Sequence, residues 1–376
     1  MPFIRRRKKL HRHFFLTRMR LLYLYPEEWT GRRAREVHTL STCVALAQSG
    51  VEVTLVTAGG EQELRRHLRD VAGAAGVPGL SFVALSRTLG PIRSASIFAR
   101  NFRRWIRSAP TFDMAFIIHL KAGAILTQAG IPYAYEAHEI FAQTPQNATR
   151  RRSLEKLEGQ VLEGAARLVA TSAPLAAALK TRFGLSRDFA IVPNAGLPPL
   201  EHCIGAPDGP FIYCGSISDW KGLDISIQAA RDARVALKIV GGTREEWWGL
   251  GEQFDTSGIV WQPRVALSKL PEMLAGARAG LIPTNPDAPS GEFSCPMKLF
   301  DYARCGLPVL TTALPSLQSL DVGAWCVQVS SSTRRAWIDT LQNFRYDGDQ
   351  AEAARAWAGE HTWAKRAGLL KRALGV

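Results

Sequence analysis

Short apolar runs alternate along the chain with longer stretches in which apolar positions recur every three or four residues. In the first half, the apolar runs lie at 21–25, 50–57, 81–85, 114–118, 133–137, 168–171 and 190–192. Runs of this length, rich in β-branched and aromatic residues, are typical of buried strands. Helical periodicity predicts helices that follow Gly31 as far as about Gln48, near 92–107, near 151–166 and near 174–183. Strands that alternate with helices predict a parallel sheet covered on both faces.

A second series of the same kind follows a stretch rich in proline, glycine and short polar residues at 197–209, which reads as a linker. Strands are expected at 211–215, 236–240, 259–262, 280–283 and 309–312. Helices are expected from a cap at Asp224 to about Ala233 and at 267–277, and an amphipathic helix opens at Thr362. A chain of 376 residues is long enough for two such domains.

One stretch of the second series, 289–312, combines a loop, a helix and a strand. Ser294 or Cys295 is a candidate helix cap, Pro296 suits the first helical position, and Gly306 suits the position just after the helix. The loop therefore leads into a helix N-terminus, whose amide groups and dipole attract anions.

Two charged residues follow on that helix. The dipole disfavours a cation such as Lys298 in the first turn, unless a phosphate binds beside it. Asp301 lies three residues further on the same face, where it could accept hydrogen bonds from a sugar hydroxyl. The alternative is an ordinary surface Lys–Asp salt bridge.

The stretch resembles the donor-binding segment of the retaining, two-domain glycosyltransferases of family 4. The match runs from Asp301 through Gly-Leu-Pro-Val309, and an acidic residue, Glu292, stands nine positions before Asp301. The family's spacing is one residue shorter, and a strict count falls on Phe293.

Four further features occur in the family's order, and the resemblance covers roughly residues 21–374. They are the turn at Gly31, His138 just after a strand, the Pro193-Asn194 turn and Lys221-Gly222 in a loop. In the family an arginine usually stands a few residues before that lysine, whereas Ser216 stands near its place here.

The resemblance implies an α/β GT-B architecture, in which two Rossmann-like domains face each other across a cleft and a C-terminal helix crosses back to the first. The implied segments are a basic segment 1–20, an acceptor domain 21–196, a linker 197–209, a nucleotide-sugar domain 210–355 and the crossing helix 356–376.

Family membership also implies an activity and a set of site residues. The activity is retaining transfer of a sugar from a nucleotide-diphosphate sugar to a hydroxyl acceptor, with no metal and no cofactor besides the donor. The implied catalytic residues are His138, Lys221 and Asp301. The implied donor-binding residues are Gly31, Gly215, Ser216, Lys221, Gly241, Arg264, Glu292, Phe293, Ser294, Cys295, Pro296, Met297, Lys298 and Asp301.

The net charge of +14 indicates an anionic partner, and the charge is uneven. Residues 1–20 carry eight Arg or Lys and no acid, which suits contact with an acidic membrane surface or a disordered segment. Residues 93–107 carry five arginines beside aromatics at helical spacing. That pattern fits either an interfacial membrane helix or a helix that packs its aromatics into the first domain.

Other features limit the classes of function. No run of eighteen apolar residues occurs, and the apolar part of residues 1–20 is too short for a signal peptide. Six cysteines without a C-x-x-C pair suggest reduced thiols, and neither a disulfide framework nor a zinc site. We therefore expect a cytoplasmic protein, in peripheral contact with the inner face of the membrane.

The expected role is in synthesis of cell-envelope polysaccharide, lipopolysaccharide or glycolipid, with a glycan or lipid-linked acceptor. The alternatives are a nucleotide-sugar epimerase or hydrolase of the same fold, and a non-catalytic basic binding protein. Nucleic acid is not an expected partner, because no nucleic-acid-binding motif is present.

Overall fold

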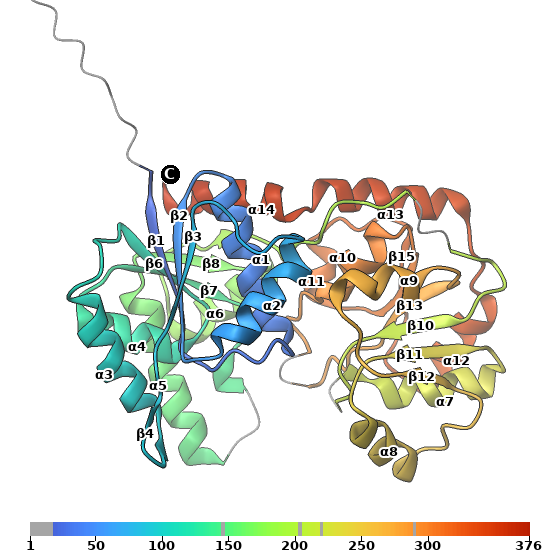
Figure 1. Ribbon diagram of the computed structural model, residues 1–376. Helices are drawn as coiled ribbons and strands as arrows, with labels where there is room; N and C mark the ends of the chain where they lie inside the picture. Colours follow the sequence, from blue (N-terminus) through green and yellow to red (C-terminus); the bar gives the residue numbers. More distant parts are fainter. Residues whose placement is uncertain (1–17, 144–146, 202–204, 219–220, 289–290) are drawn as a thin grey trace, which may run out of the picture.

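The structure is a computed structural model that describes residues 18–143, 147–201, 205–218, 221–288 and 291–376. Within these residues, two parallel β-sheets lie side by side, each flanked by helices (Figure 1). The two α/β domains expected from the alternating pattern are confirmed. The basic segment expected at 1–20 falls almost entirely outside the described residues.

The first sheet has the strand order β3-β2-β1-β6-β7-β8-β9, with every pair parallel. Because the order reverses beside β1, the carboxyl ends of β1 and β6 open a crevice of the kind that binds ligands in such sheets. The strands are β1 Arg20–Tyr25, β2 Glu52–Thr57, β3 Leu80–Ala84, β6 Met114–Ile117, β7 Tyr133–Ala137, β8 Arg167–Ala170 and β9 Ala190–Ile191.

Helices cover both faces of this sheet, and a two-stranded hairpin of β4 and β5 projects beside them (Figure 1). The sequence pattern did not predict α2, α4 or the hairpin. In α2 only Leu64, His67, Leu68 and Val71 are buried, so its apolar stripe is thin among charged residues. The elements are α1 Ala34–Gln48, α2 Glu61–Ala72, β4 Thr88–Leu89, β5 Ile92–Arg93, α3 Ala95–Ile106, α4 Leu120–Ala129, η1 Phe141–Gln143, α5 Ala148–Gly164 and α6 Ala173–Phe183.

The second sheet has the order β12-β11-β10-β13-β14-β15, again all parallel. Its strands are β10 Phe211–Cys214, β11 Leu237–Val240, β12 Val260–Gln262, β13 Ala279–Ile282, β14 Val309–Thr312 and β15 Cys326–Val329. Its helices are α7 Leu223–Ala233, α8 Arg244–Gln253, η3 Leu267–Lys269, α9 Leu270–Leu274, α10 Met297–Arg304, α11 Pro315–Gln318 and α12 Arg334–Asn343.

Two helix starts in the second domain differ from the expectation. Asp224 does not cap α7; Gly222 does, in a left-handed conformation (φ 63°). A side chain at Gly222 would collide with the carbonyl oxygen of Pro283, at 1.9 Å from its Cβ, so a capping aspartate cannot take that place. The single helix expected at 267–277 is instead η3 followed by the short α9.

Helix α10 begins one residue later than expected. Pro296 is its N-cap, with extended backbone (φ −72°, ψ 121°), and neither Ser294 nor Cys295 caps it. The carbonyl oxygen of Ser294 instead accepts a hydrogen bond from the Ser316 hydroxyl, which holds the loop against α11. At the other end, Gly306 adopts the left-handed conformation (φ 63°) expected after a helix C-terminus.

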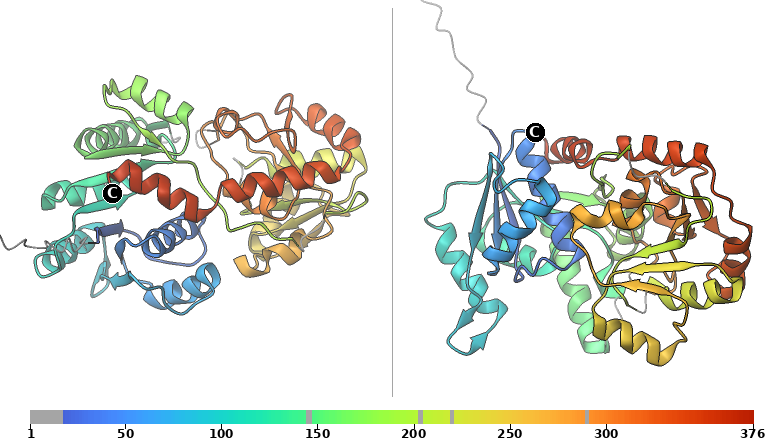
Figure 2. Two further views of the ribbon diagram at one scale, coloured as in Figure 1. Left: turned by 90° about the horizontal axis from the view of Figure 1, so that it is seen from above. Right: turned by 45° about the vertical axis from the view of Figure 1, so that its right-hand side comes forward.

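The last two helices connect the domains (Figure 2). α13 (Gly348–Glu360) packs against α10 in the second domain, and α14 (Trp363–Leu374) packs against α1 in the first. The chain crosses at His361 and Thr362, where Gly196 forms backbone hydrogen bonds of 3.0 Å with His361 and Trp363. This is the crossing C-terminal helix of a GT-B architecture. Throughout the described part of the chain, each helix is too short or too polar to span a bilayer.

Candidate active site

A cleft of about 890 Å³ lies between the two sheets and is lined by both domains. Its walls come from segments that follow the carboxyl ends of strands in each sheet. All but two of the predicted site residues line it: Gly31, His138, Gly215, Ser216, Lys221, Gly241, Arg264, Ser294, Cys295, Pro296, Met297, Lys298 and Asp301.

The other two predicted donor ligands, Glu292 and Phe293, are not in this lining. The Glu292 side chain is exposed. Phe293 is buried, 7% exposed, and belongs to the same hydrophobic cluster of the first domain as Ile140 and Ala142. The buried Phe293 ring packs the loop against the opposite domain, so the Phe293 side chain does not face a sugar in the cleft.

Three cations converge on the wall formed by the second domain. Lys221 lies in the cleft near Arg264, and burial together with this arginine lowers the pKa of Lys221 to about 8. Burial, reinforced by Lys221, also lowers the pKa of Lys298 well below its ordinary value. Holding three cationic groups together in a cleft is unfavourable in the absence of an anion. The arrangement is therefore suited to bind one.

Lys298 does not pair with Asp301, although both lie on the same face of α10. The Lys298 Nζ lies 3.8 Å from the centre of the Tyr213 ring and close to Gly215, where a side-chain Cβ would come within 3.1 Å of it. Burial raises the pKa of Asp301 to about 6, partly offset by Arg304. The alternative of an ordinary surface salt bridge is therefore wrong, and Asp301 is a carboxylate held in the cleft at an energetic cost.

Glycines let the loops after β10 and β11 approach each other at the base of the cleft. Gly241 has φ 140°, and a side chain on it would lie 1.8 Å from the Gly215 carbonyl oxygen. The Tyr213 hydroxyl donates a 2.8 Å hydrogen bond to the Ser216 carbonyl and fixes the first of these loops. The cleft floor is thus backbone, which a ligand can approach closely.

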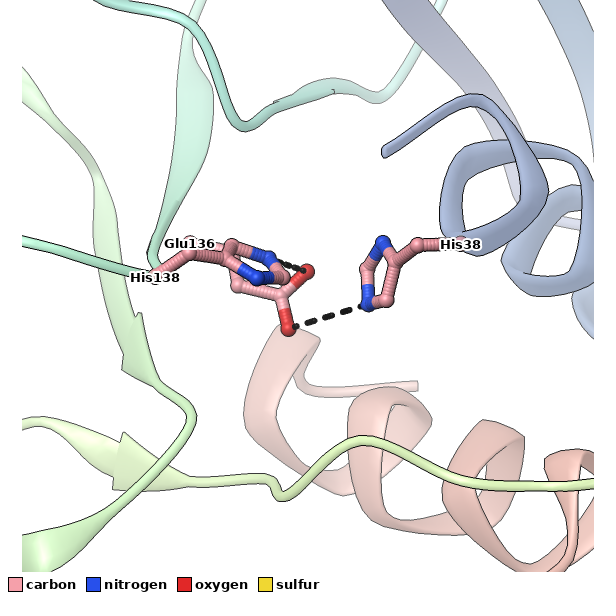
Figure 3. Close-up of side chains that lie close together, drawn as sticks. All are labelled: His38, Glu136 and His138. Carbon is pink, nitrogen blue, oxygen red and sulfur yellow. Dashed lines mark ion pairs between the residues drawn. The ribbon is translucent and has the colours of Figure 1, made fainter. Parts of the chain in front are cut away.

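On the first domain, His138 lies at the end of β7 beside Glu136 and His38 (Figure 3). The His138 Nε2 is 3.5 Å from Glu136 Oε2, and the His38 Nε2 is 3.9 Å from Glu136 Oε1. Glu136 is fully buried and also pairs with Arg366 of α14. His138 was predicted from the sequence, whereas His38 and Arg366 were not.

A signal for Arg366 was present in the sequence. It occupies the buried face of α14 with Trp363, Ala367, Leu370 and Leu374, at the spacing of an apolar stripe. An arginine at such a position needs a buried acid, because an unpaired charge in a core is strongly destabilising. Nothing in the local sequence identifies which acid it is.

Polar contacts also join the two domains across the cleft. The Asn194 side-chain amide donates a 2.6 Å hydrogen bond to the carbonyl oxygen of Cys295, beside the start of α10. The guanidinium of Arg264 donates to the carbonyl oxygen of Arg32, in the loop that leads to α1. Arg264 therefore contacts the first domain and is also one of the three cations in the cleft.

In the part of the chain that the structure describes, neither an Asp-x-Asp pair nor the cysteines add a second site. Asp347 and Asp349 form an Asp-x-Asp pair, but Asp347 caps α13 by accepting a hydrogen bond from the Asp349 amide. Within the described residues, the cysteines are buried and reduced: Cys43, Cys214, Cys295, Cys305 and Cys326.

Comparisons with known proteins agree with this architecture. Residues 33–195 match the family model of the glycosyl transferase 4-like domain, and residues 209–343 match that of the glycosyl transferases group 1. A search of curated proteins found no significant match.

Several solved structures are similar over nearly the whole chain. Sucrose-phosphate synthase from Thermosynechococcus elongatus has a TM-score of 0.74 and 16% identity, covering 95% of this chain and 99% of its own. HepE of Anabaena, in complex with UDP, has a TM-score of 0.68 and 14% identity, covering 95% and 100%. WaaG, a glycosyltransferase involved in lipopolysaccharide biosynthesis, has a TM-score of 0.68 and 15% identity, covering 94% and 98%. At such identities the likeness is one of fold.

Proposed function

The chain belongs to the two-domain glycosyl transferases that join a 4-like domain to a group 1 domain, and from this premise we propose that it transfers a sugar from a nucleotide-diphosphate donor to a hydroxyl acceptor with retention of configuration. The observation that carries the proposal is the group of three cations in the cleft, Lys221, Lys298 and Arg264, of which Lys298 lies in the first turn of α10. A diphosphate is the part of the donor that needs such a group.

The leaving diphosphate gains negative charge as the glycosidic bond breaks, so cations and amides already in place stabilise the transition state. Charge-assisted hydrogen bonds from lysine and arginine to phosphate are among the stronger polar contacts in proteins. Arg264 reaches the group from the loop after β12, and we assign it the work of the arginine that the family carries near Ser216.

The remaining cleft residues suit the sugar and nucleoside. Asp301 offers a carboxylate to a ribose hydroxyl, and His138 faces it from the first domain. The HepE structure contains UDP, which makes uridine diphosphate the first nucleotide to examine. Bringing the two domains together around the donor would exclude water and limit its hydrolysis.

The experiment is a thermal-shift screen of the full chain against UDP, GDP, ADP and TDP and their sugars. A ligand that binds only the folded state stabilises it by about 2.7 kcal/mol at a hundred times its dissociation constant. We therefore expect one nucleoside diphosphate to raise the melting temperature by a few degrees. Radiolabelled sugar from that donor should then appear on an added acceptor, rather than as free or epimerised sugar. No shift with any nucleotide would contradict the proposal.

A surface of the first domain favours an acceptor at a membrane. Residues 71–112 contain six arginines and no acid. Helix α3 buries Phe98 and Phe102, so the core-packing alternative for 93–107 is confirmed and its aromatic face is not available to lipid. The neighbouring hairpin, however, exposes Leu89 (63%) and Ile92 (61%) side by side. We propose that this hairpin and the α3 arginines contact acidic lipid at the cytoplasmic face, where a lipid-linked or envelope glycan is presented.

Vesicle co-sedimentation tests this surface. The chain should pellet with vesicles containing phosphatidylglycerol, less so as salt increases, and only weakly with phosphatidylcholine alone. Replacing both Leu89 and Ile92 by serine should weaken the binding severalfold, because two apolar side chains no longer enter the interface. Serine at the exposed Trp248 of α8 is the matched control. Equal pelleting of the hairpin variant and wild type would exclude the hairpin as the contact.

A further inference from the structure

The guanidinium of Arg366 is fully engaged inside the first domain, although the residue belongs to the last helix. It is 2% exposed. Its Nε donates a 2.8 Å hydrogen bond to the Pro193 carbonyl, its Nη1 donates one of 3.1 Å to the Thr42 hydroxyl, and its Nη2 contacts Glu136. One side chain thus joins α14 to the Pro193 turn, to α1 and to β7. Since β7 leads directly into His138, the helix is connected to the cleft.

Glu136 depends on this arginine for its charge. Burial alone would favour the protonated acid, but Arg366, with the neighbouring histidines, holds the pKa of Glu136 below its ordinary value. Its Oε1 is occupied by Arg366, whereas Oε2 has no hydrogen-bond partner among the described residues and lies 3.5 Å from His138 Nε2. A buried carboxylate oxygen is therefore directed at one ring nitrogen of the cleft histidine.

His38 supports this arrangement from α1. Its ring meets that of His138 edge to face at 4.5 Å, and neither of its buried nitrogens has a hydrogen-bond partner among the described residues. Burial lowers the pKa of His38 well below its ordinary value, so it adds no cation beside Glu136. The titratable and charged groups that interact with the pair are His38 of α1, Tyr23 of β1, Tyr135 of β7, His119 before α4, Cys295 before α10 and Arg366 of α14, and Glu139 follows His138 directly in the chain.

The same three side chains, His38, Glu136 and His138, have ligand atoms within 4.8 Å of one another, a spacing that could hold a metal ion. The Arg366 guanidinium already contacts one oxygen of the only carboxylate among them. A divalent cation placed there would be repelled by this buried positive charge at contact distance. Arg366 is thus the counterion of Glu136.

We propose that Arg366 and Glu136 act as positioning residues for the transfer reaction. Arg366 holds Glu136 as a carboxylate, and Glu136 fixes the Nε2–H edge of His138. The Nδ1 atom of His138 is then presented to the cleft. A carboxylate that accepts from one imidazole nitrogen selects the tautomer and the ring orientation. His138 would then offer Nδ1 as an acceptor to a hydroxyl of the bound sugar. The inference rests on the proposed function only for the identity of that hydroxyl.

The test follows the ring nitrogens directly by NMR of the full chain labelled with ¹⁵N-histidine, and it needs no substrate. The chain has eight histidines, and the signals of His138 are identified by their loss in His138→Gln. In the wild type we expect the Nε2–H tautomer at neutral pH. Arg366→Met should abolish this tautomer preference, because Glu136 loses the counterion that keeps it charged and a protonated carboxyl group is no longer a fixed acceptor for His138. Glu136→Gln should likewise abolish it, because the amide oxygen accepts from Arg366 and the NH2 group then replaces the carboxylate oxygen that faces His138 Nε2.

Two further variants complete the series. Arg366→Lys keeps a cation and should retain the wild-type tautomer, and Arg372→Met, on the exposed side of α14, should have no effect. Where Arg366→Met does not fold, Glu136→Gln carries the test, since an amide oxygen still accepts from Arg366.

An unchanged tautomer in folded Glu136→Gln would overturn the proposal and leave the network a purely structural role. Stoichiometric Zn²⁺ that shifts the signals of both His38 and His138 would overturn it in favour of a metal site. Because none of these readouts uses a donor sugar, their failure is distinct from failure of the sugar-transfer assignment.

Discussion

Replacing Lys221 with alanine should lower the rate of sugar transfer by about a hundredfold to a thousandfold, the range seen when one preorganised charge-stabilising donor is removed from an active site. The Lys221 amine belongs to the cation group that we assign to the diphosphate, and burial, with Arg264 close by, keeps its pKa at about 8. A bound diphosphate would add negative charge beside the amine and restore the full cation. The substitution therefore removes an interaction with the leaving diphosphate, so kcat should fall along with donor affinity.

The same substitution should not weaken the empty protein through charge. The folded pKa of Lys221, about 8, lies below its ordinary value of 10.5, so the folded state binds fewer protons between these pH values. The contribution of this group to the free energy of unfolding therefore rises with pH through that window. At pH 7 the buried, charged amine destabilises the folded protein, and alanine removes that destabilisation.

Kinetics with a matched control would check this. Lys269→Ala removes a lysine that is 61% exposed and paired with Glu272 in the same domain, and it should behave as wild type. Lys221→Arg keeps a cation and should retain part of the activity. Turnover of Lys221→Ala within twofold of wild type would exclude Lys221 from the site.

Asp301→Asn should weaken donor binding about tenfold to a hundredfold, because a charged acceptor for a sugar hydroxyl is lost. The same substitution should make the empty protein more stable at pH 7. Burial raises the folded pKa of Asp301 to about 6, above its ordinary value of 3.8. Between these values the folded state binds more protons than the unfolded one, so its stability falls as pH rises through this window. Above pH 6 the whole penalty is present, and asparagine should relieve on the order of 2 kcal/mol of it.

Melting curves from pH 4 to pH 8 would show the effect as a gap between the Asp301→Asn variant and the wild-type protein that opens up to about pH 6 and then stays constant. Asp339→Asn, at a half-exposed residue paired with Arg335, is the matched control. A variant less stable than wild type at pH 7 would mean that Asp301 is satisfied within the empty protein.

Much of the fold could be predicted because strand position depends on local composition. The strand Tyr133–Ala137 was predicted with its observed ends, whereas α2 was missed because its few apolar residues lie among charged ones. In the cleft, Lys298 and Asp301 could be named from one stretch, since a helix start brings its own residues together.

The network behind His138 could not be found in that way. Glu136 and Arg366 are 230 positions apart, and only the crossing of α14 brings them into contact. No local pattern pairs two residues across such a separation. The placement of Phe293 was missed for the same reason: its burial depends on a cluster in the other domain.

The return of α14 to the first domain also has a consequence for biosynthesis. Trp363, Ala367, Leu370 and Leu374 fill the same hydrophobic cluster as Leu40 of α1. While the nascent chain is still on the ribosome, this part of the N-terminal lobe has no cover and Glu136 has no counterion. The first domain therefore cannot complete its folding when only its own sequence has been translated. Because α14 follows the second domain in the chain, folding of the first domain is completed only after the second domain has been made.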